Sequence, residues 1–152
     1  MIRGFEVPKS IFEGLVKHLV ELEKQKDELL EDFFPIPSKE RDELEKLIDL
    51  YIKQVELLIQ EARKSETAGS SLPFVTVGSE VELQDLSTLE VHRFRLVTPF
   101  SSDTEGDDVS CISPVGKALL LKRVGDEVTV HAPAGVFRYK IVSIKWHGDE
   151  DR

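Results

Sequence analysis

The sequence predicts an α+β protein in which a long helical hairpin precedes a small antiparallel β domain with one short helix. Apolar residues recur at helical spacing up to residue 64, and from residue 73 onward the pattern is that of short strands. A small, polar stretch at residues 65–71 separates the two patterns. We therefore expect a coiled-coil hairpin domain with its linker over residues 1–70 and a second domain over residues 71–152.

The first half is expected to form two long helices, over about residues 8–34 and 39–64. In the first, a stripe with alternating spacings of three and four contains one polar member: Phe12, Leu15, Leu19, Leu22, Lys26, Leu29 and Phe33. The second stripe consists of Leu44, Ile48, Tyr51, Val55, Leu58 and Ala62. Pro35 and Pro37 must end the first helix, and Ser38 can cap the second. The short connection predicts that the two helices pack antiparallel.

The second half is rich in Val, Ile, Phe and Thr, which predicts about five strands. They are expected at residues 74–83, 90–97, 109–112, 127–131 and 136–146. Turn residues lie at Gly125 and at Pro133–Gly135, and the segment from Pro114 to Leu121 predicts a short helix. These elements favour a single antiparallel sheet with one helix.

Composition and charge exclude several classes of function. The net charge is −9 over 152 residues, which disfavours nonspecific binding to duplex nucleic acid. The single cysteine, Cys111, excludes an internal disulfide and multi-cysteine zinc motifs. The histidines are scattered, and no glycine-rich phosphate loop occurs, so neither an intrinsic cofactor nor a metal site is expected. No signal peptide or membrane span is evident, and a cytoplasmic protein with no membrane partner is expected.

Five segments of the second half, in order along the chain, resemble the C-terminal domain of the Gre transcript-cleavage factors. The segments are residues 77–83, 93–97, 112–120, 124–128 and 132–135. The most specific is Ser-Pro-x-Gly-x-Ala-Leu-Leu, beginning at Ser113 and followed by Val-Gly-Asp at Val124. The family consists of bacterial RNA polymerase elongation factors. The resemblance implies an FKBP-like fold for the second domain, and the first half is similar to the family's N-terminal coiled-coil hairpin in architecture only.

The resemblance also implies a partner and a way of binding it. In the family the globular domain docks on the rim of the RNA polymerase secondary channel while the hairpin enters the pore. Carried over to this chain, the docking residues are Ile112, Ser113 and Pro114. RNA polymerase is thus the expected partner of a monomeric factor that meets the nascent RNA 3′ end only indirectly. A structural interpretation is open beside this one, with Ser113 capping the short helix and Pro114 in its first turn.

Cleavage in the family depends on carboxylates at the hairpin tip, which complete a second Mg²⁺ site in the polymerase. The family's Asp-Leu-x-Glu-Asn stretch does not occur here. Candidate metal-assisting acids are Glu31 and Asp32, which end the first helix, followed by Glu40, Asp42 and Glu43, which begin the second. Acids in a first helical turn are also favoured by the helix dipole, and this alternative applies to the second group.

An apolar group occupies the predicted tip, consisting of Phe33, Phe34 and Ile36. One interpretation is that these side chains close the open end of the hairpin. The other is that they contact the polymerase pore or another protein, which would suit a Gre-like regulator that blocks or remodels the channel without stimulating cleavage. In either case the chain is not itself an enzyme.

The alternative from another class is a peptidyl-prolyl isomerase or chaperone module, suggested by the FKBP-like fold alone. An isomerase pocket needs aromatic lining, and the second half offers few candidates: Phe74, Phe94, Phe100, Phe137, Tyr139 and Trp146.

A run of acids lacks the spacing of a calcium site and is interpreted as a solvated loop. These acids are Asp103, Glu105, Asp107 and Asp108.

Overall fold

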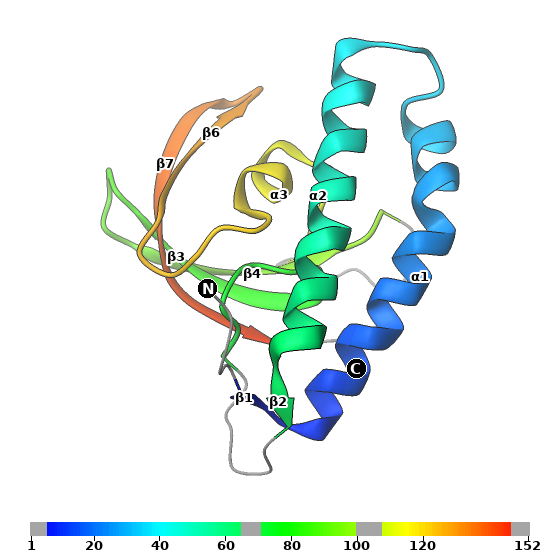
Figure 1. The fold of residues 1–152 in the computed structure, drawn as a ribbon. Coiled ribbons are helices and arrows are strands. Elements are labelled where there is room, and N and C mark those ends of the chain that lie inside the picture. Colours follow the sequence, from blue (N-terminus) through cyan, green and yellow to red (C-terminus); the bar gives the residue numbers. More distant parts are fainter. Residues whose placement is uncertain (1–5, 65–70, 100–107, 147–152) are drawn as a thin grey trace. The chain divides into compact units, whose positions relative to one another are not determined.

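The computed structural model describes residues 6–99 and 108–146, apart from residues 65–70. Two long helices precede a curled sheet that carries a short helix, so the predicted α+β class is confirmed (Figure 1). The chain divides into two compact units, Met1–Gly69 and Ser70–Arg152.

The first unit is an antiparallel pair of helices, α1 (Lys9–Phe33) and α2 (Lys39–Glu61). Its core follows the predicted stripes closely. The buried side chains are Ile11, Leu15, Leu19, Leu22, Leu29 and Leu30 from α1 and Leu44, Ile48, Tyr51, Val55 and Leu58 from α2. Two predicted members of the first stripe are wrong, because Phe12 is only half-buried and Phe33 is 44% exposed. Ile11 and Leu30 lie in the core instead.

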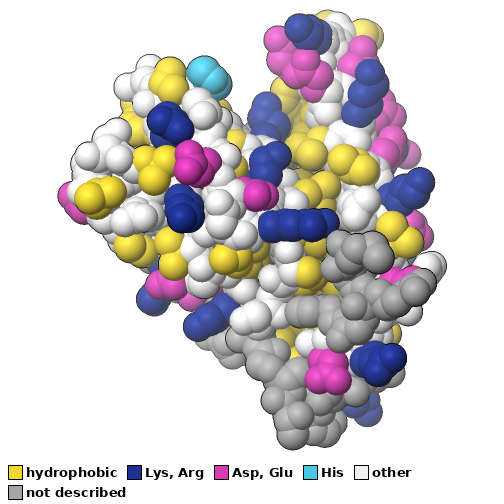
Figure 2. All heavy atoms as spheres, turned by 60° about the vertical axis from the view of Figure 1, so that its left-hand side comes forward, with side chains coloured by type: hydrophobic (Ala, Val, Ile, Leu, Met, Phe, Trp, Pro, Cys, Tyr) yellow, Lys and Arg dark blue, Asp and Glu magenta, His cyan; other side chains and the backbone are white. Residues whose placement is uncertain are grey.

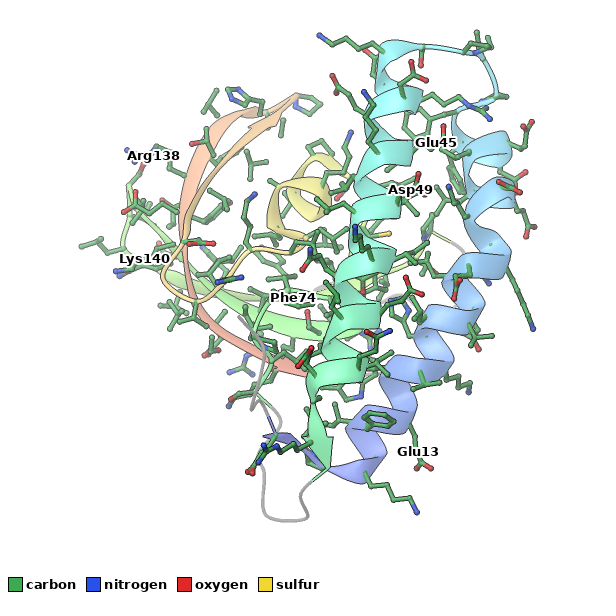
Figure 3. All side chains as sticks on the ribbon, in the orientation of Figure 1. Glu13, Glu45, Asp49, Phe74, Arg138 and Lys140 are labelled. Atoms are coloured by element: carbon green, nitrogen blue, oxygen red, sulfur yellow. The ribbon has the colours of Figure 1, made fainter. Side chains whose placement is uncertain are left out.

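The polar member of the first stripe, Lys26, pairs across the hairpin with acids of α2. Its Nζ donates a hydrogen bond to Oδ1 of Asp49 and lies 3.9 Å from Oε2 of Glu45. Figure 3 shows Glu45 and Asp49 on successive turns of α2. The hydrogen bond to Asp49 raises the pKa of Lys26, with further attraction from Glu45 and Asp27 and partial opposition from burial. The positive charge of Lys26 within the apolar stripe is thus balanced by the acids of α2 that lie beside it.

The base of the hairpin is joined by a short parallel ladder that the sequence pattern did not predict. Here β1 (Glu6–Val7) pairs with β2 (Arg63–Lys64). The second helix therefore ends at Glu61 rather than at residue 64, because Ala62 already has extended backbone angles. Val7 is fully buried.

The second unit contains a five-stranded sheet in the order β5-β4-β3-β7-β6. Its strands are β3 (Ser79–Asp85), β4 (Val91–Val97), β5 (Asp108–Ser110), β6 (Glu127–Ala132) and β7 (Gly135–Trp146). All neighbours are antiparallel except β4 and β5, which run parallel. A bulge between Glu82 and Leu83 shifts the register of β3 against β7.

One face of this sheet forms the core of the second unit. Alternation along β3 and β6 buries Val81, Leu83, Val128 and Val130, and β7 buries Ile141 and Ile144 on either side of its register shift. The short helix α3 (Pro114–Leu119) packs beside β6, and Leu119 is fully buried. Arg138 and Lys140 of β7 are exposed, and Figure 3 shows both on the outer side of the sheet.

The acidic segment before β5 is not a uniformly solvated loop. Asp103, Glu105 and Asp107 lie outside the described residues, but Asp108 lies in β5 with only 4% of its side chain exposed. Its Oδ2 accepts a hydrogen bond of 2.8 Å from Nη2 of Arg95 on β4, which is also buried. This ion pair ties the parallel edge strand to the sheet.

Candidate functional site

The turn at the tip of the hairpin is built from capping interactions on both sides. At the end of α1, the Phe34 N–H donates to the Leu30 carbonyl at 2.8 Å. At the start of α2, the Ser38 hydroxyl accepts a hydrogen bond from the Arg41 N–H at 3.0 Å. The predicted N-cap is therefore present. Pro35 and Pro37 lie exposed between these caps and restrict the backbone of the turn.

Arg41 joins the two helix ends, a role that the sequence pattern did not predict. Its Nη1 donates to the Phe34 carbonyl at 2.6 Å, and its Nη2 lies 3.3 Å from Oε1 of Glu31. A guanidinium at a helix C-terminus satisfies a carbonyl that the helix leaves without a partner. The signal in the sequence was a basic residue three positions after the N-cap, but its partner across the turn could not be read from spacing.

The structure places the candidate tip acids around this turn without joining them into one site. Glu31 is paired with Arg41, and Glu43 lies 3.9 Å from Lys39. Asp32, Glu40 and Asp42 are exposed. Within the described part of the chain, no group of three or more His, Cys, Asp or Glu side chains is positioned to hold a metal ion. Figure 2 shows acidic and basic side chains mixed at this end of the hairpin.

The apolar residues of the tip do not close the hairpin. Ile36 is 76% exposed and Phe33 is 44% exposed, while Phe34 is half-buried. The interpretation that these side chains seal the open end is therefore wrong for Ile36 and Phe33. Leu29 and Leu30 fill that position in the core instead, at 1% and 2% exposure.

The predicted docking segment forms the turn between β5 and α3. The Ser113 hydroxyl accepts from the Gly116 N–H at 3.1 Å and donates to the Ser110 carbonyl at 2.7 Å. Ser113 is thus the N-cap of α3, and Pro114 is in its first turn and exposed. The structural interpretation of Ser113 and Pro114 is confirmed by this geometry.

The glycine of this motif is required by close packing against β5. A Cβ on Gly116 would lie 2.0 Å from the Ser110 carbonyl oxygen and 2.8 Å from the Cys111 Cα. Both neighbours are backbone atoms, so they cannot move aside as a flexible side chain could. The Ser-Pro-x-Gly sequence therefore encodes a cap, a first-turn proline and a close helix–strand contact within four positions.

Ile112 and Cys111 precede the cap and differ in exposure. Ile112 is partly exposed, and its N–H lies 3.3 Å from the Ser110 hydroxyl. Cys111 is buried, and this burial raises the pKa of its thiol to about 12. The thiol is thus protonated at neutral pH and packs as a small apolar side chain. Ile112, Ser113 and Pro114 together present a mixed apolar and polar turn.

Two other motif segments are also turns with glycine at a position of positive φ. In the first, the Ser79 N–H donates to the Thr76 carbonyl at 3.1 Å, and Gly78 has φ +89°. In the second, the Asp126 N–H donates to the Arg123 carbonyl at 3.0 Å, and Gly125 has φ +92°. Glycine adopts this backbone conformation without steric cost. Much of the ordered signature is therefore turn chemistry that shapes the sheet unit.

The chain is a two-unit protein in which a helical hairpin is followed by a five-stranded sheet with a capped helix that begins with Ser-Pro. In a comparison with known families, the family described as "Transcription elongation factor, GreA/GreB, C-term" matches residues 70–146. The chain belongs to the GreA/GreB family.

Individual relatives match over part of their length. The chain is 40% identical to Transcription elongation factor GreA of Thermotoga maritima over 93 residues, 61% of this chain and 59% of the relative. It is 34% identical to Transcription elongation factor GreB of Xanthomonas axonopodis pv. citri over 99 residues, 65% and 59% of the two chains. The match thus spans less than two thirds of each relative. The isomerase or chaperone alternative is not favoured by these comparisons.

A solved structure from the same group is similar over most of the chain. The GreA/GreB factor of Nitrosomonas europaea is 25% identical, covers 93% of this chain and 98% of its own, and has a TM-score of 0.48. No helix in the described ranges is long and apolar enough to cross a lipid bilayer.

Proposed function

We propose that this protein is a Gre-type transcription elongation factor that binds RNA polymerase at its secondary channel and modulates elongation. The observation that carries the proposal is the ordered family signature over residues 70–146, whose motifs fold into the capped turn and shaped sheet described above. The factor is not itself an enzyme, and any phosphodiester chemistry belongs to the polymerase.

The sheet unit is proposed as the docking unit, through Ile112, Ser113 and Pro114. The caps at Ser113 fix the turn in one conformation before binding, and this lowers the entropic cost of association. Pro114 is exposed and Ile112 partly so, which makes both available to a partner. A mixed turn of this kind suits a protein surface better than a nucleic acid, because it carries no basic group that would meet phosphate.

The hairpin is proposed as the unit that reaches the polymerase interior. At about 1.5 Å per residue, the 25 residues of α1 give a rod of roughly 38 Å. Asp32 is proposed as the first tip acid able to approach a polymerase-bound Mg²⁺, because it is exposed, whereas the neighbouring Glu31 is engaged by Arg41. Glu40, Asp42 and Glu43 are the further candidates, and no resident cofactor of the factor itself is proposed.

The test is a backtracked elongation complex, assembled with a bacterial RNA polymerase and supplied with Mg²⁺ and this protein. Release of short 3′ RNA fragments above the level of polymerase alone would support cleavage stimulation. We expect Asp32→Ala to abolish that release and Glu31→Ala to reduce it less. Leu50→Ser, on α2 and away from the tip, is the matched control.

The same assay separates the remaining outcomes. Binding without fragment release would point to a factor that blocks or remodels the channel. Absence of binding to the polymerase, measured by co-sedimentation with the full-length protein, would overturn the proposed function.

A further inference from the structure

The tip of the hairpin exposes apolar side chains on a turn that is already fixed. Ile36, in the turn, is 76% exposed, and Phe33, at the end of α1, is 44% exposed. Single exposed apolar residues are common on protein surfaces and need no explanation. This pair differs because it lies at the far end of a two-helix rod: Phe33 is the last residue of α1, and Ile36 lies between Pro35 and Pro37 in a turn with few free backbone torsions.

Arg41 adds contacts that hold the turn in place. Its guanidinium holds the Phe34 carbonyl at 2.6 Å and Glu31 at 3.3 Å, while Ser38 caps α2. The backbone that carries the apolar side chains is therefore held by caps and prolines rather than forming a loose loop. A preformed apolar anchor loses little conformational entropy when it is buried by a partner.

The charges around the anchor indicate what kind of surface it fits. Each basic side chain of the tip lies near an acid: Arg41 Nη2 is 3.3 Å from Glu31, and Lys39 Nζ, on an exposed side chain, is 3.9 Å from Glu43. Asp32, Glu40 and Asp42 have no ion pair with the other described residues and are exposed around the turn. The tip is thus an apolar apex surrounded by more acidic than basic side chains.

We propose that Ile36 and Phe33 form an anchor that inserts into an apolar pocket with a basic rim on the polymerase, and that Arg41 positions this anchor. The proposal rests on the proposed function, since it names the surface that the hairpin tip meets. The anchor supplies affinity at the tip through buried apolar area, independently of any carboxylate acting on a metal ion.

The experiment measures the dissociation constant of the full-length protein for a bacterial RNA polymerase elongation complex by fluorescence anisotropy. We expect Ile36→Ser to raise the dissociation constant about tenfold, as expected when burial of one large aliphatic side chain is lost. Phe33→Ser should act in the same direction. The matched control is Leu50→Ser, because Leu50 is 50% exposed on the same hairpin outside the tip, and this variant should bind as the wild type does.

Two further measurements address the rim and the positioning role. In Asp32→Asn/Asp42→Asn, which leaves the apolar apex unchanged, we expect binding to weaken less steeply with added salt than in the wild type. Arg41→Ala should raise the dissociation constant, and Arg41→Lys should restore it only in part, since an ammonium cannot engage Phe34 and Glu31 with the same fork. Helix content by circular dichroism should stay unchanged in every variant.

The outcomes distinguish the two proposals. Wild-type protein that fails to bind the polymerase would overturn the proposed function. Wild-type binding that equals the binding of Ile36→Ser and Phe33→Ser would overturn the anchor and leave the function standing. A photo-crosslinker at position 36 that captures polymerase would support the anchor, whereas one that captures only a second copy of the chain would contradict it.

Discussion

At the turn between β5 and α3, the helix can lie against the strand because Gly116 has no side chain. Any larger side chain would overlap the Ser110 carbonyl oxygen, at 2.0 Å from a Cβ. The Ser110 carbonyl oxygen and the Cys111 Cα, which would lie 2.8 Å from the same Cβ, are both atoms of packed backbone. The overlap is therefore relieved only if α3 moves away from β5. That movement would also disturb the hydrogen bonds of the Ser113 cap.

We therefore expect Gly116→Ala to destabilise the sheet unit by about 2 kcal/mol or more, although alanine has the higher intrinsic helix propensity. The measurement is urea unfolding followed by tryptophan fluorescence, because Trp146 is the only tryptophan and lies in β7. Lys117→Ala, at the adjacent position of α3, should change the free energy of unfolding by less than about 0.5 kcal/mol. Equal stability of the two variants would contradict the packing argument.

A second residue-scale expectation concerns Glu82 on β3. The hydroxyl of Ser143 donates to its Oε1 at 2.7 Å, and Arg93 lies 3.4 Å from its Oε2. The hydrogen bond from Ser143, followed by that from Arg93, lowers the pKa of Glu82 below its usual value of 4.5. A lowered folded-state pKa contributes stability that is present above pH 4.5 and is lost as pH falls through the folded-state pKa.

We expect Ser143→Ala to be less stable than the wild type at pH 7, with the difference shrinking as pH falls below 4.5 and through the folded-state pKa of Glu82, since protonated Glu82 gains less from the hydroxyl. Urea unfolding by Trp146 fluorescence at several pH values gives the comparison. Ser87→Ala, in the exposed turn after β3, serves as the control because its side chain does not face Glu82. A difference that is constant with pH would show that the hydroxyl acts only through packing.

At the scale of elements, the two helices are aligned by a charge inside their apolar stripe. Lys26 lies where a leucine would fit the period, and it is engaged by Asp49 and Glu45. A charged group at such a position stabilises the register in which its partners lie opposite and disfavours sliding by one turn. The hairpin thus has a defined register in which Arg41 can reach Glu31 and Phe34.

We expect Lys26→Glu to lower the stability of the hairpin by about 1 kcal/mol, because it removes the pairing and brings like charges together. Lys26→Glu/Asp49→Lys should recover part of the loss. Thermal melting followed by circular dichroism at 222 nm reports mainly on α1 and α2, the two long helices. The pairing would be refuted if the double variant were no more stable than the single one.

The sequence predicted the helices and their buried residues correctly where a single hydrophobic period determined them. The stripe from Leu44 to Leu58 lies in the core as expected, because the 3.6-residue period and the packing partner agree. At the helix ends the pattern failed: Phe33 continues the spacing, but the chain turns and leaves it outside the core. Two-residue strands such as β1 carry no detectable period and depend on a partner distant in the sequence.

In the candidate site, too, the local interactions could be predicted from the sequence, and those that depend on the path of the chain could not. Ser113 as a cap followed from local sequence chemistry, and so did Ser38. The role of Arg41 did not, since a guanidinium reaching across a turn to a carbonyl depends on the three-dimensional path of the chain. The burial of Asp108 likewise depends on its pairing with Arg95, which no spacing rule reveals.

For the whole molecule, the proposed function assigns different tasks to the two units. The Ser113 turn belongs to the sheet unit and the anchor to the hairpin, and no residue is shared between them. If docking and tip action are separate, changes in the two units should affect different measured quantities. A docking change should alter how much factor is needed, and a change to a tip acid should alter what the bound factor does.

We expect Ile112→Glu to shift the concentration of factor required for half-maximal effect on an elongation complex at least about tenfold, because it places a charge in the docking turn. The effect at saturation should stay unchanged. Asp32→Ala should lower the saturating effect, and it should change the half-maximal concentration less than Ile112→Glu does. The measurement is a titration of transcript cleavage or elongation rate, with Leu50→Ser as control in both arms. If Ile112→Glu instead lowered the saturating effect, the sheet unit would have to act within the reaction itself, and the separation of tasks between the two units would be wrong.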